Sequence, residues 1–200
     1  MSAGRRHSQD ESRNEQPHIH GLSSRISGPI DECDLNGGAR SSECEFGFNE
    51  VSAWITKAAD MVPADKYNYR PNDSVRSFAE QMLHLAAADA GMVMIGTGSK
   101  DPKIPGIFFS RNLEKLPSAQ SKDSVVYFVT TSYDFVINTL KNLTDLRFDE
   151  VVTQQMPAAV RSEARLVWLQ KAFEHQTHHR GQCTIYIRMQ GIRPPGEKLF

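Results

Sequence analysis

One segment near the middle of the chain constrains the fold more than any other. Residues 82–95 read Met-Leu-His-Leu-Ala-Ala-Ala-Asp-Ala-Gly-Met-Val-Met-Ile, so a helix built from them is apolar nearly all round. Such a helix is stable in water only when other elements pack on several of its sides. We therefore predict that it is the central helix of a helical domain, beginning after a cap at Asp73 or Ser74 and ending at about Ile95.

Three other segments carry apolar residues at the spacing of three and four that is typical of helices. They cover about residues 44–61, 122–143 and 157–190, and the last has proline in its first turn. Residues 96–119 contain glycine and proline breaks and are predicted to form a long surface connection. No alternating run demands a sheet, so we expect an all-α, four-helix bundle over residues 43–200.

The first part of the chain has a different composition. Residues 1–42 hold few large apolar side chains and many Ser, Arg, Glu, Asp and Gly, so they cannot bury enough surface to offset the entropy of ordering. We expect a disordered tail here. His18 and His20 form an HxH pair in this tail, but a flexible pair gives no preorganised metal site.

Charge and cysteine content exclude several classes of protein. The chain has 23 basic and 24 acidic residues, so no broad positive field favours nucleic acid as a partner. Cys33, Cys44 and Cys183 are odd in number and form no CxxC, which argues against a disulfide framework or a zinc finger. The sequence contains neither a run of about 18 apolar residues nor a signal peptide pattern. We expect a cytoplasmic protein without a membrane span.

Two histidines of the last predicted helix lie four residues apart. His175 and His179 therefore share one helix face and lie about one turn apart, which allows two imidazoles to chelate one ion. Surface helices also acquire such pairs by chance, so the spacing alone leaves both interpretations open. His178 lies roughly 60° away from His175 around the helix and is not expected to join the pair.

A further histidine, His84, lies inside the apolar central segment, where a polar ring needs a partner. Two interpretations are open from the residues alone. His84 is either a core histidine bonded to a backbone carbonyl or to Asp89, or a third metal ligand. It points away from the main apolar stripe of its helix, so periodicity does not show which helix it faces.

Two stretches of the sequence match the pattern of a known family. One runs from Asn68 through Pro71 to His84, a proline-containing lead-in to a helix with a histidine. The other is His175-Gln-Thr-His-His179-Arg-Gly-Gln182. On these motifs and the helix pattern, residues 44–196 resemble the DinB/YfiT-like superfamily of metal-binding four-helix bundles.

The resemblance implies an up-down-down-up topology and a metal triad made of His84, His175 and His179, binding nickel or zinc. It also implies several kinds of function. The first is a metal-dependent S-transferase that acts on a small-molecule substrate with a low-molecular-weight thiol. Alternatives are a metal-dependent hydrolase and a non-catalytic, dimeric stress-response protein. A homodimer is expected, because apolar bundle faces often pair.

A three-histidine site would leave the ion its full charge and at least one open position, as in catalytic zinc sites. Such an ion lowers the pKa of a bound thiol or water and so supplies a nucleophile. Glu80 and Asp89, which flank His84 along the helix, are weak candidates for an acid or base, since such residues more often hold a ligand in place or lie in solvent. Cys183 is better explained by packing.

Overall fold

The computed structural model describes residues 37–100, 113–143, 147–155 and 159–196. Four long helices account for most of this part of the chain: α1 Gly37–Met61, α2 Phe78–Thr97, α3 Lys122–Lys141 and α4 Arg165–Met189. The shorter elements are the 3₁₀ helices η2 Ala64–Lys66, η4 Leu113–Lys115 and η5 Pro117–Ala119 and the strands β1 Val151–Gln155 and β2 Val160–Ala164. The predicted four-helix architecture is confirmed.

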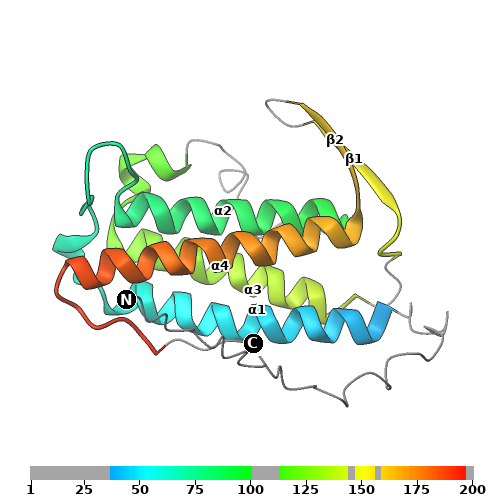
Figure 1. The fold of residues 1–200 in the computed structure, drawn as a ribbon, viewed down its shortest axis with the longest axis horizontal. Helices are drawn as coiled ribbons and strands as arrows, with labels where there is room; N and C mark the ends of the chain where they lie inside the picture. Colours follow the sequence, from blue (N-terminus) through cyan, green and yellow to red (C-terminus); the bar gives the residue numbers. More distant parts are fainter. Residues whose placement is uncertain (1–36, 101–112, 144–146, 156–158, 197–200) are drawn as a thin grey trace, which may run out of the picture. The chain divides into compact units, whose positions relative to one another are not determined.

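The four helices form a bundle of up-down-down-up topology (Figure 1). Lys122 at the start of α3 contacts Asp60 near the end of α1, so these two helices are antiparallel. The Arg165 guanidinium at the start of α4 donates to the Gly96 carbonyl near the end of α2 at 3.1 Å, so this pair is antiparallel too. α2 and α3 run parallel, so both begin at the same end of the bundle.

The core lies between the apolar faces of the four helices. Residues 82–95 were predicted to be packed on several sides, and α2 packs against α3, α4 and η4. The largest fully buried side chains are Trp168, Tyr67, Tyr133, Phe48, Phe78, Ile55, Met82, Leu83, Leu85, Leu113 and Leu140. Among the described helices, even α2 is not long and apolar enough to cross a membrane.

The start of α2 differs from the prediction. Its N-cap is Ser77, whose hydroxyl accepts from the Glu80 N–H at 3.2 Å while the Glu80 carboxylate accepts from the Ser77 N–H at 2.7 Å. This capping box satisfies two backbone donors at once. Asp73 and Ser74 lie in the preceding turn, where the Ser74 hydroxyl donates to the Asn72 side chain at 2.6 Å.

A β-hairpin replaces the first two turns predicted for the last helix, so the expectation of no sheet was wrong. β1 and β2 pair antiparallel with Val151 opposite Ala164, and α4 begins at Arg165. Pro157, the predicted start of this helix, lies outside the described residues. Val151, Val152 and other β-branched residues favour a pleated strand, and this local preference prevails over the proline signal. Figure 1 shows the hairpin projecting from the end of the bundle where α4 starts.

The first helix begins earlier than predicted. α1 starts at Gly37 rather than at about Cys44, so residues 37–42, which composition had assigned to the tail, are helical. Residues 1–36, with His18 and His20, lie outside the described residues. The boundary between tail and bundle therefore moves toward the N-terminus.

Alanine substitutions at two glycines, one within α2 and one directly after it, are expected to change stability in opposite directions. Gly98 ends the helix with a φ of 73° and donates its N–H to the Met94 carbonyl at 2.8 Å. Gly98→Ala is expected to lower the free energy of unfolding by about 1 kcal/mol, because a Cβ disfavours the left-handed region. Gly91→Ala is expected to raise it by roughly 0.5 to 1 kcal/mol, because a Cβ there meets no atom within 4 Å and alanine favours a helix. Denaturant unfolding of both variants tests this, and equal signs would contradict it.

Candidate metal centre

Three histidines from two antiparallel helices converge between α2 and α4. His84 comes from α2, and His175 and His179 come from α4. The Nε2 atom of His175 lies 3.3 Å from Nε2 of His84 and 3.0 Å from Nε2 of His179. One nitrogen of each ring lies within 4.8 Å of the others. The direction of His84, which periodicity had left open, is therefore toward α4.

The spacing of these nitrogens fits a metal ion. Three nitrogen ligands about 2.05 Å from one ion at tetrahedral angles lie about 3.3 Å from one another, close to the two separations from His175. Neutral imidazoles that turn their lone pairs toward one point repel each other unless a cation or a proton lies between them. Imidazole donors suit zinc and nickel among the divalent metals.

Two of the rings are held from behind by carboxylates. Nδ1 of His175 lies 2.9 Å from Oδ1 of Asp89, and Nδ1 of His84 lies 2.9 Å from Oε2 of Glu114. An ionised carboxylate only accepts hydrogen bonds, so a neutral ring that faces one carries its proton on Nδ1. The lone pair of each ring is then on Nε2, which is the tautomer that metal binding through Nε2 requires.

The electrostatic surroundings keep the three histidines neutral. Burial lowers the pKa of His179 to about 3, and the neighbouring histidines and Arg76 act in the same direction. Burial and then Arg76 lower the pKa of His175 to about 4. The pKa of His84 is also lowered, by burial first and Arg76 second, although Glu114 opposes the shift. All three rings are therefore neutral at pH 7 and able to act as ligands.

Asp89 is fully buried behind His175, and only one of its oxygens is hydrogen-bonded. Oδ2 has no partner within the described residues, and burial raises the pKa of this carboxyl well above its ordinary value. A buried carboxylate is costly unless a positive charge lies close to it. A cation on the far side of the His175 ring would supply that charge, so Asp89 fits a metal centre as a group that orients a ligand, not as an acid or base at the open side.

The carboxylate of Glu80, the other candidate acid or base, accepts two hydrogen bonds from groups that belong to the start of α2 and the turn before it. The donors are the Ser77 N–H and the Arg70 guanidinium, both at 2.7 Å. Burial acts to raise the pKa of Glu80, but the hydrogen bonds from Ser77 and Arg70 outweigh it and hold this pKa below its ordinary value. Glu80 therefore caps α2 instead of contacting the histidines.

Replacing Glu80 with alanine should accordingly affect stability and not metal binding. We expect Glu80→Ala to lower the free energy of unfolding by about 1 kcal/mol through loss of the capping box. Glu174→Ala is the control, because Glu174 is exposed next to His175 and should change stability little. Denaturant unfolding and zinc titration of both variants test this, and weaker zinc binding by Glu80→Ala would contradict the assignment.

The sequence did not predict two of the groups behind the rings. Glu114 lies in η4, within the stretch predicted to be a loop, and its Oε2 also accepts from Nε of Arg76 at 3.0 Å. No local pattern relates Glu114 to His84, because only the tertiary fold brings them together. Gln81, which contacts His179, does carry a signal, since it lies one turn before His84 on the same helix.

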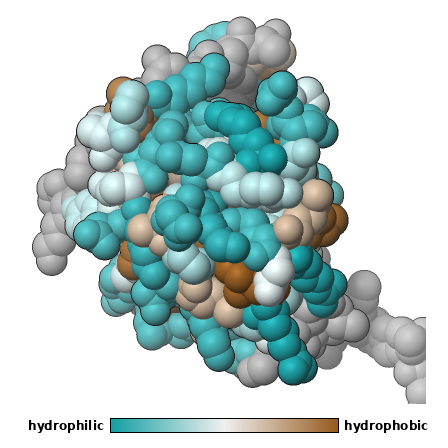
Figure 2. Space-filling view, turned by 90° about the vertical axis from the view of Figure 1, so that its left-hand side faces the viewer, coloured by the Kyte–Doolittle hydropathy of each residue, from teal (hydrophilic) through white to brown (hydrophobic). Residues whose placement is uncertain are grey.

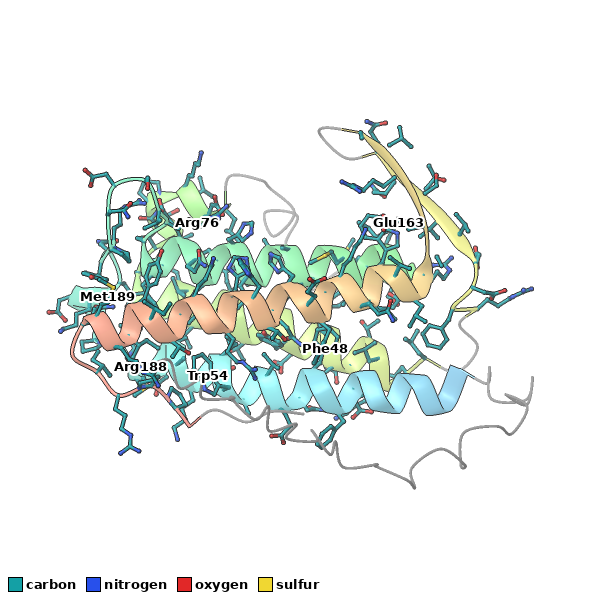
Figure 3. All side chains as sticks on the ribbon, viewed as in Figure 1. Phe48, Trp54, Arg76, Glu163, Arg188 and Met189 are labelled. Carbon is teal, nitrogen blue, oxygen red and sulfur yellow. The ribbon has the colours of Figure 1, made fainter. Side chains whose placement is uncertain are left out.

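A cavity of about 580 Å³ lies at the N-terminal end of α2, and its lining includes Gln81 and Glu114, which lie behind the rings, but none of the three histidines. The charged residues that line it are of both signs. The basic ones are Arg70, Arg76 and Lys115, and the acidic ones are Asp73, Glu80 and Glu114. Figure 3 shows Arg76 beside this end of α2, far from Glu163 of the hairpin. Figure 2 looks onto this end of the bundle, where the surface is mostly hydrophilic with small apolar patches. The balanced charge does not by itself select one class of ligand.

His178 and Cys183 stay outside the cluster, as predicted for His178 from its position on the helix and for Cys183 from the usual packing role of a single cysteine on an apolar helix. His178 is exposed, and its Nε2 lies 2.9 Å from Nε2 of Gln182. Cys183 is fully buried with its Sγ 4.0 Å from Sδ of Met82, and burial raises the pKa of its thiol to about 12. A thiol in this state packs in the core and does not ligate a metal.

Fold and site together define a four-helix bundle with a candidate three-histidine metal centre between two antiparallel helices. The chain belongs to the DinB family, whose family model matches residues 48–199. This confirms the resemblance found in the sequence. A comparison with curated proteins found no match.

Solved structures of two bacterial proteins share the fold. A DinB-like protein from Bacillus cereus ATCC 10987 is 17% identical with a TM-score of 0.54, covering 74% of this chain and 91% of that chain. A DinB-like protein from Bacillus subtilis is 19% identical with a TM-score of 0.54, covering 79% of this chain and 96% of that chain. At this identity the likeness concerns the fold alone.

Proposed function

We propose that this DinB family protein binds one zinc or nickel ion through His84, His175 and His179 and uses it to activate a nucleophile. One observation carries the proposal. Three Nε2 atoms converge at the spacing of metal ligands, while Asp89 and Glu114 occupy Nδ1 of two of the rings. This arrangement orients lone pairs toward a common point and supports a mononuclear site.

The residues around the cluster suit a catalytic site better than a closed structural one. A bound ion would act as a Lewis acid and lower the pKa of a coordinated thiol or water. The three neutral imidazoles add no negative charge, and the chain provides no fourth ligand among the described residues near them. Asp89 and Glu114 both lie behind the rings, so neither is placed as a general base on the open side.

We propose group transfer to a low-molecular-weight thiol as the reaction, with a small electrophilic molecule as the second substrate. The family resemblance supports both the thiol and the small-molecule substrate. The cytoplasmic location and the homodimer stay predictions from composition and from the apolar bundle faces.

Metal content and turnover test this function together. The purified chain is expected to retain about one equivalent of zinc or nickel by elemental analysis. It should speed the reaction of glutathione or cysteine with chlorodinitrobenzene, and chelation should abolish the effect until metal is restored. Full turnover by metal-free protein would contradict the proposal. Ester hydrolysis without thiol transfer by the metal-loaded protein would show that water is the nucleophile.

A further inference from the structure

The third ring of the cluster has no carboxylate behind it. Nδ1 of His179 lies 2.7 Å from the side-chain nitrogen of Gln81, which is only 3% exposed. An amide can present either its oxygen or its nitrogen to a ring, and the two are assigned from the hydrogen-bond network. His179 is therefore the one ring of the three whose proton position is not determined by its immediate partner.

Gln81 belongs to a chain of hydrogen-bonding groups that reaches the surface. Its side-chain nitrogen also contacts Oε1 of Gln182 on α4. Nε2 of Gln182 in turn lies 2.9 Å from Nε2 of His178, which is exposed. The chain of groups thus runs from His179 through two glutamine amides to a surface imidazole.

Two arrangements of hydrogen atoms satisfy this chain. In the first, the Gln81 NH₂ group donates to His179 and to Gln182, and the Gln182 NH₂ group donates to His178. His179 then carries its proton on Nε2, facing the other two rings. In the second, both amides are turned over, so that Gln81 Oε1 accepts from His179 Nδ1–H and from Gln182, while Gln182 Oε1 accepts from His178 Nε2–H.

We propose that Gln81 is a positioning residue that accepts the Nδ1 proton of His179 through its side-chain oxygen, with Gln182 holding the amide in that orientation. The inference rests on the proposed metal site, because only the second arrangement leaves a lone pair on His179 Nε2. It gives all three rings an acceptor behind Nδ1. A neutral amide does so without adding a third negative charge beside Asp89 and Glu114.

Two substitutions of opposite character test the role of Gln81 by calorimetric zinc titration. Gln81→Met removes the acceptor at similar volume and is expected to weaken zinc binding about 10- to 100-fold. Gln81→Glu keeps an acceptor and removes the donor, so its affinity should stay within about threefold of the unmodified chain or exceed it. If Gln81 only fills space, the order reverses: the methionine variant binds normally and the glutamate variant binds weakly.

A matched control separates ring positioning from loss of a buried amide. Gln176 is fully buried on α4 next to His175, and no described residue hydrogen-bonds its side-chain amide. Gln176→Met should therefore leave zinc affinity unchanged. An equal loss of affinity in the Gln176 and Gln81 variants would overturn the proposal.

A measurement on the unmodified chain keeps the inference testable even if a variant fails to fold. Nuclear magnetic resonance of isotope-labelled histidine nitrogens distinguishes the two tautomers of each ring. With zinc bound, His179 is expected as the Nδ1–H tautomer, and its Nδ1 proton should exchange slowly with water because the Gln81 oxygen accepts it. A zinc-loaded chain in which His179 carries its proton on Nε2, or in which its Nδ1 proton exchanges as fast as that of a free imidazole, would overturn the role of Gln81. Failure of the chain to bind zinc or nickel would refute the proposed function instead.

Discussion

His179→Ala is expected to lower zinc affinity at least about a hundredfold, whereas His178→Ala should change it by less than about threefold. Zinc-finger peptides gain about 10 to 16 kcal/mol from four ligands, so one ligand contributes about 3 kcal/mol, which is more than a hundredfold in affinity. His179 turns Nε2 toward His175 at 3.0 Å, while His178 is exposed and bonded to Gln182. His178→Ala is therefore the comparison on the same helix that removes no proposed ligand, only the surface end of the hydrogen-bonded chain behind His179.

Calorimetric titration of both metal-free variants with zinc and with nickel gives the two affinities directly. Thermal unfolding without metal should accompany it, so that a folding defect is not taken for a lost ligand. Loss of binding in His178→Ala with retention in His179→Ala would mean that the helix register is wrong, and with it the proposed set of ligands.

The helices were predictable because their apolar residues recur at the spacing that places them on the buried side of a helix. Apolar residues spaced three and four apart mark the buried faces of α1 and α3, and the all-round apolar stretch of α2 marks its central place. The start of α4 was not predictable in this way. Residues 151–164 carry both a proline helix-start signal and β-branched strand residues, and pairing between β1 and β2 decides the outcome.

Only the part of the candidate site that lies on one helix was predictable from residue spacing. The four-residue spacing of His175 and His179 places both on one face, but the direction of His84 depends on how α2 packs against α4. Glu114 reaches His84 from a segment between helices, where no periodic pattern operates. Groups that hold ligands from behind are therefore the part of such a site that sequence spacing reveals least.

Asp89→Asn is expected to have opposite effects on metal binding and on the stability of the metal-free chain. The asparagine can still accept from Nδ1 of His175, but without a negative charge it makes the ring a weaker ligand, so zinc affinity should fall about 10- to 100-fold. Without metal, the unmodified carboxyl is fully buried with one unpartnered oxygen. Removing its charge should therefore raise the free energy of unfolding at pH 7 by about 1 kcal/mol or more.

The gain in free energy of unfolding expected for metal-free Asp89→Asn should increase with pH. Burial raises the pKa of Asp89 in the folded state, so this carboxyl stabilises the fold below its unfolded pKa of about 4 and loses that contribution as pH rises through the folded pKa. The advantage of Asp89→Asn in metal-free protein should accordingly be present at pH 7 and vanish near pH 3. Asp134→Asn, a change on the exposed face of α3, should show neither effect. Denaturant unfolding across this pH range measures the difference, and a metal-free Asp89→Asn chain less stable than the unmodified one at pH 7 would show that Asp89 is stabilised by something other than a cation beyond His175.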